Sequence, residues 1–272
     1  MRRYLEQQVT LGGAEVILPG RPSQEPSRGA VPAEPEAPPL APTASAREAE
    51  PPGGKAKGGA DWRTGAPPIP GPGLVVDPPA QDLLTPRGKD YPDLAAIAKA
   101  VAACKACFLA EGRTNTVPGE GNPEARLLLV GEGPGQTEDQ TGRPFVGRAG
   151  ELLNDILKAI GFAREEVFIC NVVKCRPPQN RKPLPDEMST CIPFLEAQID
   201  LVRPKVILAL GATAAEALLK VRRSLSELRT KVHSYRGVPL VVTYHPAALL
   251  RNPNWKKPTW DDVRIARQLV DR

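Results

Sequence analysis

The chain has 272 residues and a net charge of +5 at neutral pH, and its positive charge lies in the second two-thirds of the sequence. No run of residues approaches the roughly 18 apolar positions of a membrane helix, and no apolar signal region follows Arg2 and Arg3, so we expect a cytoplasmic protein that does not enter a membrane. The five cysteines then indicate metal binding or reactivity rather than disulfides. The basic balance suits a polyanionic partner, but it is equally typical of an ordinary basic protein.

Composition divides the chain into a tail and one folded part. Residues 1–18 are compatible with a short helix, which either docks a protein partner or has no role. Prolines and glycines crowd residues 19–90, and such a segment buries too little apolar surface to offset its ordering entropy, so we predict a disordered linker. Residues 91–272 are long enough for one sizeable core, and we expect them to form a single domain that acts as a monomer.

The folded part alternates between helices and short apolar strands. Asp93 is predicted to cap a helix over residues 94–110. The remaining predicted elements are strands over 126–130, 167–173, 206–210 and 238–243, and helices over 151–160, 186–201, 212–219 and 261–269. This alternation is typical of an α/β domain with a central four-stranded parallel sheet that is covered on both faces.

The connection of residues 131–150 is rich in glycine and reads as a long segment without regular structure of its own. Such a connection is usually functional, and glycines let the backbone approach a ligand closely; the alternative is a surface Ω-loop. It follows the first strand, Asn171 lies towards the end of the second, and His245 follows the fourth. Because ligands bind beyond the carboxyl ends of parallel strands, this convergence predicts a ligand site.

Four of the cysteines have spacings that suit metal binding. Cys104 and Cys107 form a C-x2-C pair, and Cys175 and Cys191 form a C-x15-C pair. A four-thiolate site holds zinc by default and an iron–sulfur cluster as the alternative, and two unrelated thiol pairs are the third reading. Cys170 lies inside an apolar strand and is predicted to be a small core residue.

Three long motifs now point to one family. They are GEGPGQTEDQTGRPFVGRAG (131–150), NVVKCRPPQNRKPLPDE (171–187) and HPAALLRNP (245–253). With the cysteine spacing, residues 94–271 resemble the family 4 uracil-DNA glycosylases, the iron–sulfur branch of their superfamily. Ala247 departs from this pattern, since serine is common there.

That resemblance implies a three-layer αβα sandwich and a monofunctional DNA-repair enzyme of base excision repair. Its substrate would be uracil in single- or double-stranded DNA, its product an abasic site, and its cofactor a [4Fe-4S] cluster. The cluster ligands that the resemblance implies are Cys104, Cys107, Cys175 and Cys191.

The resemblance also implies roles for individual residues around a flipped-out uracil. His245 would donate to the negative charge that develops on uracil O2, and Glu132 would support the cationic sugar and orient the attacking water. Phe145 would stack on the base, and Asn171 would accept from N3–H and donate to O4.

The remaining roles concern the pocket wall and the DNA backbone. The backbone near Gly133 would add donors, and Glu138 would crowd the position of a thymine methyl group. Leu249 and Leu250 would fill the gap that the flipped base leaves, and Arg251 would bind phosphate. Arg176 and Arg181 are further phosphate candidates.

Two other classes of function compete with this reading. One is a nucleic-acid-binding module without chemistry, against which the combination of Glu132, Asn171 and His245 argues. The other is an electron-transfer protein, for which no flavin or nicotinamide fingerprint is found.

Overall fold

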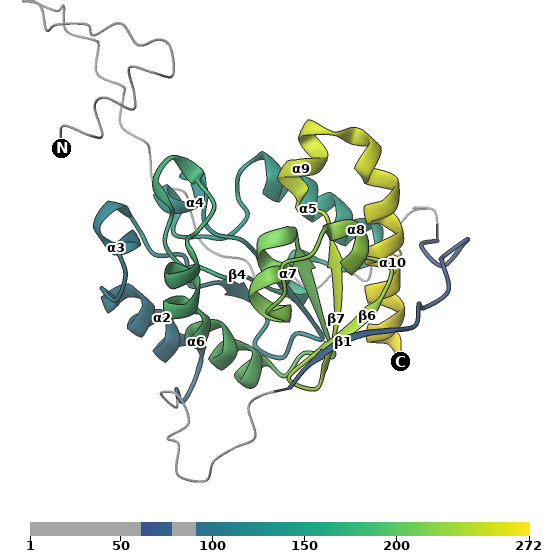
Figure 1. Ribbon diagram of the computed structural model, residues 1–272, viewed down its shortest axis with the longest axis horizontal. Coiled ribbons are helices and arrows are strands. Elements are labelled where there is room, and N and C mark those ends of the chain that lie inside the picture. Colours follow the sequence, from purple (N-terminus) through teal and green to yellow (C-terminus); the bar gives the residue numbers. More distant parts are fainter. Residues whose placement is uncertain (1–60, 78–90) are drawn as a thin grey trace, which may run out of the picture. The chain divides into compact units, whose positions relative to one another are not determined.

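A mixed seven-stranded sheet forms the centre of the protein in the computed structural model, which describes residues 61–77 and 91–272 (Figure 1). The predicted helix over 1–18 lies outside the described residues, as does the larger part of the predicted linker over 19–90. Within the two described ranges, no helix has the length and apolar character needed to cross a bilayer.

The strand order places the four predicted strands side by side in the middle of the sheet. From edge to edge, the strands are β1 (Pro72–Val76), β6 (Val232–Tyr235), β7 (Val238–Thr243), β5 (Val206–Leu210), β3 (Leu127–Gly131), β4 (Phe168–Asn171) and β2 (Glu120–Gly121). The four central strands are parallel, as predicted, but β6 pairs antiparallel with β7 and β2 pairs antiparallel with β4.

The prediction of a four-stranded sheet is therefore wrong in strand number. The three added strands lie towards the edges and carry weak sequence signals. β2 has only two residues, β6 alternates with polar side chains, and β1 lies in a proline- and glycine-rich stretch. Each of these features lowers the apolar signal on which the strand predictions depend.

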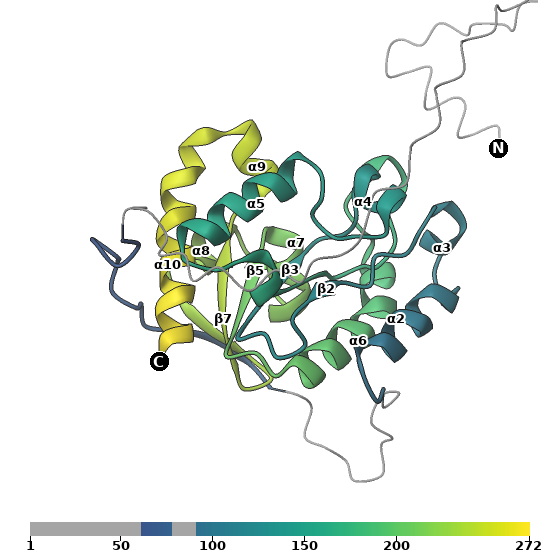
Figure 2. The same ribbon diagram turned by 180° about the vertical axis from the view of Figure 1, so that it is seen from behind.

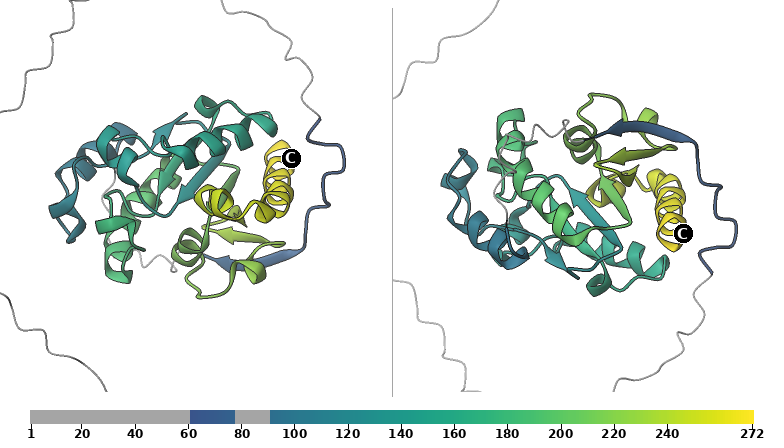
Figure 3. Two further views of the ribbon diagram at one scale, coloured as in Figure 1. Left: turned by 90° about the horizontal axis from the view of Figure 1, so that it is seen from above. Right: turned by 90° about the horizontal axis from the view of Figure 1, so that it is seen from below.

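Alternate residues of the central strands face two separate cores. In β3, Leu128 and Val130 face one core, and Leu127 and Leu129 face the other. The helices divide between the two faces, with α6 (Pro185–Val202) and α7 (Ala212–Leu219) on the first and α5 (Arg148–Ala159) and α10 (Lys256–Asp271) on the second (Figures 2 and 3). The predicted three-layer αβα arrangement is confirmed.

The helix predicted over 94–110 is divided by the segment that carries the first cysteine pair. α2 spans Leu94–Ala103, and its predicted cap Asp93 accepts a hydrogen bond from a backbone N–H of the first turn. The helix ends at Cys104, which has extended backbone angles, and α3 (Leu109–Gly112) follows. The prediction of one continuous helix is wrong, and both cysteines of the pair lie in the turn between α2 and α3.

The glycine-rich connection of residues 131–150 contains a short helix. α4 (Gln136–Thr141) ends at Gly142, where φ is 71°. Asp139 of α4 is buried, and its Oδ1 accepts a 2.9 Å hydrogen bond from the Thr114 backbone N–H. The expectation of a connection without regular structure is wrong. The helix was missed because its six residues are polar and show no apolar periodicity in the sequence.

Residues 61–77, which the sequence placed in the linker, form an arm against β6 and α10. β1 of this arm pairs parallel with β6, and the Leu74 backbone N–H donates to His233 Nδ1 at 2.9 Å. Two side chains of α10 donate to backbone carbonyls of the arm. The folded unit therefore begins before residue 91, the boundary that composition suggested.

We expect the replacement of Trp62 with alanine to lower the free energy of unfolding by about 3 kcal/mol, since aromatic-to-alanine changes at buried sites cost amounts of this order. Trp62 is 9% exposed, and the guanidinium groups of Arg63 and Arg267 lie 4.5 Å and 5.6 Å from its ring. Urea denaturation measures the change. The control Val75→Ala, at a position on β1 that is 64% exposed, should shift stability by less than about 0.5 kcal/mol. Equal unfolding curves for Trp62→Ala and wild type would contradict a stabilising arm.

Candidate active site

A cleft of about 390 Å³ opens at the carboxyl ends of the central strands. Its size lies within the range of roughly 300–1,000 Å³ that is usual for small-molecule sites. The predicted residues that line it are Glu132, Gly133, Glu138, Phe145, Asn171, Arg181, His245 and Arg251. The structure therefore brings together residues from the ends of three strands, as the sequence predicted.

Asn171, the last residue of β4, presents an unpaired polar atom beside this cleft. Its side chain is 1% exposed, and its Oδ1 accepts no hydrogen bond from any described residue. A side chain at Gly131 would collide with Oδ1 and with the Phe145 ring, so the glycine permits this close approach. Buried polar atoms are normally paired, and an unpaired one in a cleft indicates that a ligand supplies the donor.

Phe145 is held in a backbone conformation that non-glycine residues rarely adopt. Its φ is 50°, and its ring is buried. Arg164 donates to the Phe145 carbonyl at 3.1 Å and to the Pro144 carbonyl at 2.6 Å, and Glu120 Oε1 accepts a 2.6 Å bond from the same guanidinium. Gly150 packs so closely against the Phe145 carbonyl that no side chain would fit there. The ring position is thus fixed from several sides.

Arg164 was missed at the sequence level. It lies in a 3-10 turn, Arg164–Glu166, between α5 and β4, at a position without any motif. Its two carbonyl acceptors are about twenty residues away in the chain, so only the folded structure joins them.

His245 is held as a neutral imidazole with a defined tautomer. It caps α9 (Pro246–Arg251), and its Nδ1 accepts a 3.1 Å hydrogen bond from the Ala247 backbone N–H. The proton of the ring therefore lies on Nε2. Burial, with a smaller effect from Arg251, lowers the pKa of His245 to about 4. Its ring stacks on Phe145 with 5.4 Å between ring centres.

The Glu132 carboxylate is oriented by Thr213, a second residue that sequence reasoning missed. Thr213 lies in the first turn of α7, is buried, and donates to Glu132 Oε2 at 2.5 Å. Glu132 Oε1 accepts no hydrogen bond from the described residues, so this oxygen remains available to a ligand or a water molecule.

Glu138 stabilises the connection of residues 131–150, which forms part of the cleft lining. Its Oε1 accepts hydrogen bonds from the backbone N–H groups of Val146 and Gly147, at 2.9 Å and 3.0 Å. Gly133 lies against Val173, where a Cβ atom would come within 2.7 Å of the valine methyl group. Both residues line the cleft, and Glu138 also fixes the turn that leads into α5.

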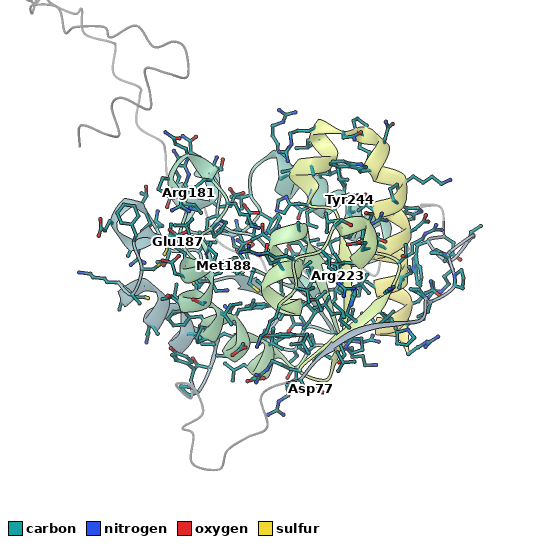
Figure 4. The ribbon with its side chains drawn as sticks, viewed as in Figure 1. Asp77, Arg181, Glu187, Met188, Arg223 and Tyr244 are labelled. Atoms are coloured by element: carbon teal, nitrogen blue, oxygen red, sulfur yellow. The ribbon has the colours of Figure 1, made fainter. Side chains whose placement is uncertain are left out.

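The residues that were expected to contact DNA differ in accessibility. Leu250 is 41% exposed and Arg251 is exposed, whereas Leu249 is 1% exposed. The expectation that Leu249 fills the gap in the DNA does not agree with this burial, whereas the exposed Leu250 is accessible. Arg181 forms a two-pronged ion pair with buried Glu187, at 2.8 Å and 2.6 Å (Figure 4).

The four predicted ligand cysteines line one common void beneath α2 and α3. Arg113 Nη1 donates to Cys175 Sγ at 3.1 Å, and Lys174 lines the same void. Burial raises the pKa of the Cys191 thiol to about 11. Cys170 lies in β4, fully buried, and is the core residue that the sequence predicted.

These thiols do not converge on a single point. Across residues 61–77 and 91–272, no three His, Cys, Asp or Glu side chains lie close enough to ligate one metal ion. Four cysteines around one void are a donor set that suits either a zinc ion or an iron–sulfur cluster.

Comparison with known proteins shows what this chain is similar to. A family model described as the uracil DNA glycosylase superfamily matches residues 118–266. The chain is 46% identical to a type-4 uracil-DNA glycosylase of Thermotoga maritima over 180 residues, which are 65% of this chain and 94% of the relative. A type-4 uracil-DNA glycosylase of Sulfurisphaera tokodaii is 46% identical over 183 residues, 64% and 83% of the two chains. A type-5 uracil-DNA glycosylase of Thermus thermophilus is 36% identical over 149 residues, 47% and 68% of the two chains.

Proposed function

Because the chain belongs to the uracil-DNA glycosylase superfamily and matches its type-4 members over most of their length, we propose that it removes uracil from DNA and leaves an abasic site. The reaction is hydrolysis of the N-glycosidic bond of a uracil that has been flipped out of the base stack. The observation that carries the proposal is the buried, unpaired Oδ1 of Asn171 beside the stacked rings of Phe145 and His245.

Base selection follows from the hydrogen-bonding pattern of this amide. Asn171 Oδ1 accepts from uracil N3–H, and the amide nitrogen donates to O4. Cytosine presents an acceptor at N3 and a donor at N4, so it would leave buried polar groups unpaired and would be rejected. Phe145 stacks on the base, the backbone near Gly133 supplies further donors, and Glu138 crowds the position of a thymine methyl group.

Two side chains act on the bond that breaks. The C1′–N1 electron pair leaves with uracil, and the sugar becomes a cation. The Nε2–H of neutral His245 donates to the negative charge on uracil O2, as preorganised donors do at developing oxyanions. Glu132, oriented by Thr213, stabilises the cationic sugar and takes the proton of the water that attacks C1′.

The four cysteines are proposed to hold a [4Fe-4S] cluster, with Cys104, Cys107, Cys175 and Cys191 as ligands. When bound, the cluster supplies a covalent tie between the α2–α3 turn, the loop after β4 and α6. Arg113 donates to Cys175 and so partly offsets the negative charge of the thiolates.

We expect Cys175→Ala to lose most of its iron and sulfide and to melt at a lower temperature than wild type, because one of four ligands is removed. Iron and sulfide analysis of anaerobically purified protein measures the loss. Cys170→Ala is the control, since Cys170 is buried outside the void and should keep its full iron content. Zinc in place of iron in the wild-type protein would rule out the cluster.

Arg164→Met is expected to lower kcat/KM about tenfold. The variant loses the two hydrogen bonds from Arg164 to the carbonyls of Pro144 and Phe145, which hold the Phe145 backbone at positive φ and so fix the position of its ring. Single-turnover uracil release measures the rate. Arg143→Met is the matched control: Arg143 also pairs with Glu120, at 2.8 Å, but it touches neither carbonyl. Equal losses in the two variants would assign the effect to Glu120 rather than to Phe145.

The activity itself is tested with oligonucleotides that contain one uracil, in single-stranded and duplex form. After incubation with the purified protein, alkali cleaves the strand at each abasic site. Cleavage of the uracil strands and not of matched thymine and cytosine strands supports the proposal; no cleavage of any strand contradicts it. A monomeric state, a cytoplasmic location and a protein partner for residues 1–18 remain predictions.

A further inference from the structure

A column of stacked side chains runs from α10 to Trp255, which follows the cleft residue Arg251 by four positions in the chain. From the interior outwards, its members are Asp262, Arg229, Tyr244 and Trp255. None of the steps of uracil removal uses these residues.

The interior end of the column is a buried ion pair. Asp262 is 1% exposed, and its carboxylate accepts bonds from Arg229 at 2.6 Å and 3.0 Å and from Thr243 Oγ1 at 2.7 Å. The Arg229 guanidinium lies 4.6 Å from the centre of the ring of Tyr244, which is labelled in Figure 4. Tyr244 therefore has a fixed support on its inner face.

The outer end of the column is an exposed indole. The rings of Tyr244 and Trp255 are 4.8 Å apart at their centres and inclined by only 2°, so Tyr244 covers one face of the indole. Trp255 is nevertheless 36% exposed. Since one face is covered, this exposed area belongs to the opposite face and the edges, and the indole presents a flat apolar surface to solvent.

Positive charges surround this surface. Arg251, Lys256 and Lys257 are exposed and form no ion pair with residues of the described ranges. An exposed aromatic face among unpaired cations is the combination with which proteins bind unpaired nucleic-acid strands, because every base has a face that stacks and every linkage has a phosphate.

The column also adjoins the catalytic histidine. Thr243, which bonds Asp262, and Tyr244, which carries the indole, immediately precede His245 in the chain. A strand that delivers uracil to His245 would thus pass Trp255 with a neighbouring nucleotide.

We propose that Trp255 is a stacking platform for an unpaired nucleobase of single-stranded DNA, at a position that flanks the flipped uracil. The proposal rests on the proposed function only in taking DNA as the substrate. In a duplex the flanking bases are already stacked on each other, so the platform acts on single strands.

The test measures binding to DNA without uracil, so it does not depend on glycosylase activity. With labelled oligothymidylate and full-length protein, Trp255→Ala should bind roughly tenfold more weakly than wild type, with an unchanged salt slope, because stacking and not charge is lost. Trp255→Phe, which keeps an aromatic ring, should bind nearly as wild type. Wild-type affinity in Trp255→Ala would overturn the proposal, and so would an equal loss on a duplex of the same length.

Tryptophan emission separates a stacking contact from a merely structural role. Oligothymidylate should quench the emission of the wild-type protein, and Trp255→Phe should lose most of this quenching while it retains binding. Trp62→Phe is the matched control, because Trp62 lies in the arm against α10 and should leave the quenching intact. Full quenching in Trp255→Phe would place the base elsewhere. A protein that binds through Trp255 but releases no uracil would disprove the glycosylase activity and leave the platform standing.

Discussion

Asn171→Ala is expected to lower the rate of uracil release by at least about thirtyfold. The variant loses two hydrogen bonds to the base in a buried site, each worth roughly 1–3 kcal/mol when its partner is left unpaired, and about 1.4 kcal/mol corresponds to a factor of ten. Single-turnover release from a uracil-containing strand measures the change. Cys170→Ala, one residue earlier on β4, removes a side chain that faces the core and serves as the control. A wild-type rate of uracil release in Asn171→Ala would show that Asn171 does not bind the base.

A second variant at the same position tests selectivity rather than rate. Asn171→Asp replaces the amide with a carboxylate, which accepts from the cytosine amino group but repels uracil O4. The ratio of cytosine to uracil release should therefore rise, even though uracil release falls. An unchanged ratio would mean that Asn171 supports the pocket without reading the base.

His245→Ala is expected to lower kcat by about 10²–10³-fold, the usual effect of removing one preorganised donor to a developing negative charge. KM should change less, because this contact strengthens as the bond breaks. His245→Gln retains a neutral N–H donor and should recover part of the lost rate. If alanine and glutamine behaved alike, the donor role would be wrong.

The pH dependence of the wild-type enzyme follows from the same group. Because burial lowers the pKa of His245 to about 4, the ring stays neutral well below the ordinary histidine value of 6.5. Protonation would place a hydrogen on Nδ1, where the Ala247 N–H already donates. The part of kcat that depends on His245 should hold from neutral pH to about 5 and fall as pH passes about 4. The stability from this neutral ring is likewise present above pH 6.5 and is lost between 6.5 and 4.

The sequence was sufficient to predict the parts of the fold that have a strong local pattern of apolar residues. The four buried strands and the residues at their ends were predicted because apolar runs and chain connectivity specify them. The edge strands β1 and β2 and the adjacent β6 were not predicted, since pairing near an edge needs few apolar residues. The arm of residues 61–77 was missed for a related reason: its composition resembles a linker, and its stability comes from contacts with α10.

The residues of the candidate site likewise divide into those that the sequence identifies and those that only the structure reveals. Glu132 and His245 follow strands and Asn171 ends one, all within recognisable motifs, so these residues could be identified before the structure. Thr213 and Arg164 act on motif residues from distant segments, and no local pattern marks them. Leu249 and Leu250 are adjacent and chemically alike, and only the packing of α9 distinguishes the buried one from the exposed one.

The left-handed backbone of Phe145 has a consequence for the end of the reaction. Because Arg164 and the close approach of Gly150 fix the Phe145 backbone from within the protein, the pocket does not have to form around the incoming base. The shape of the pocket also stays the same when the glycosidic bond breaks. The free base then leaves a site that still matches it, so we expect added uracil to compete with the DNA substrate. The rigid position of the Phe145 ring therefore affects both the recognition of the substrate and the release of the product.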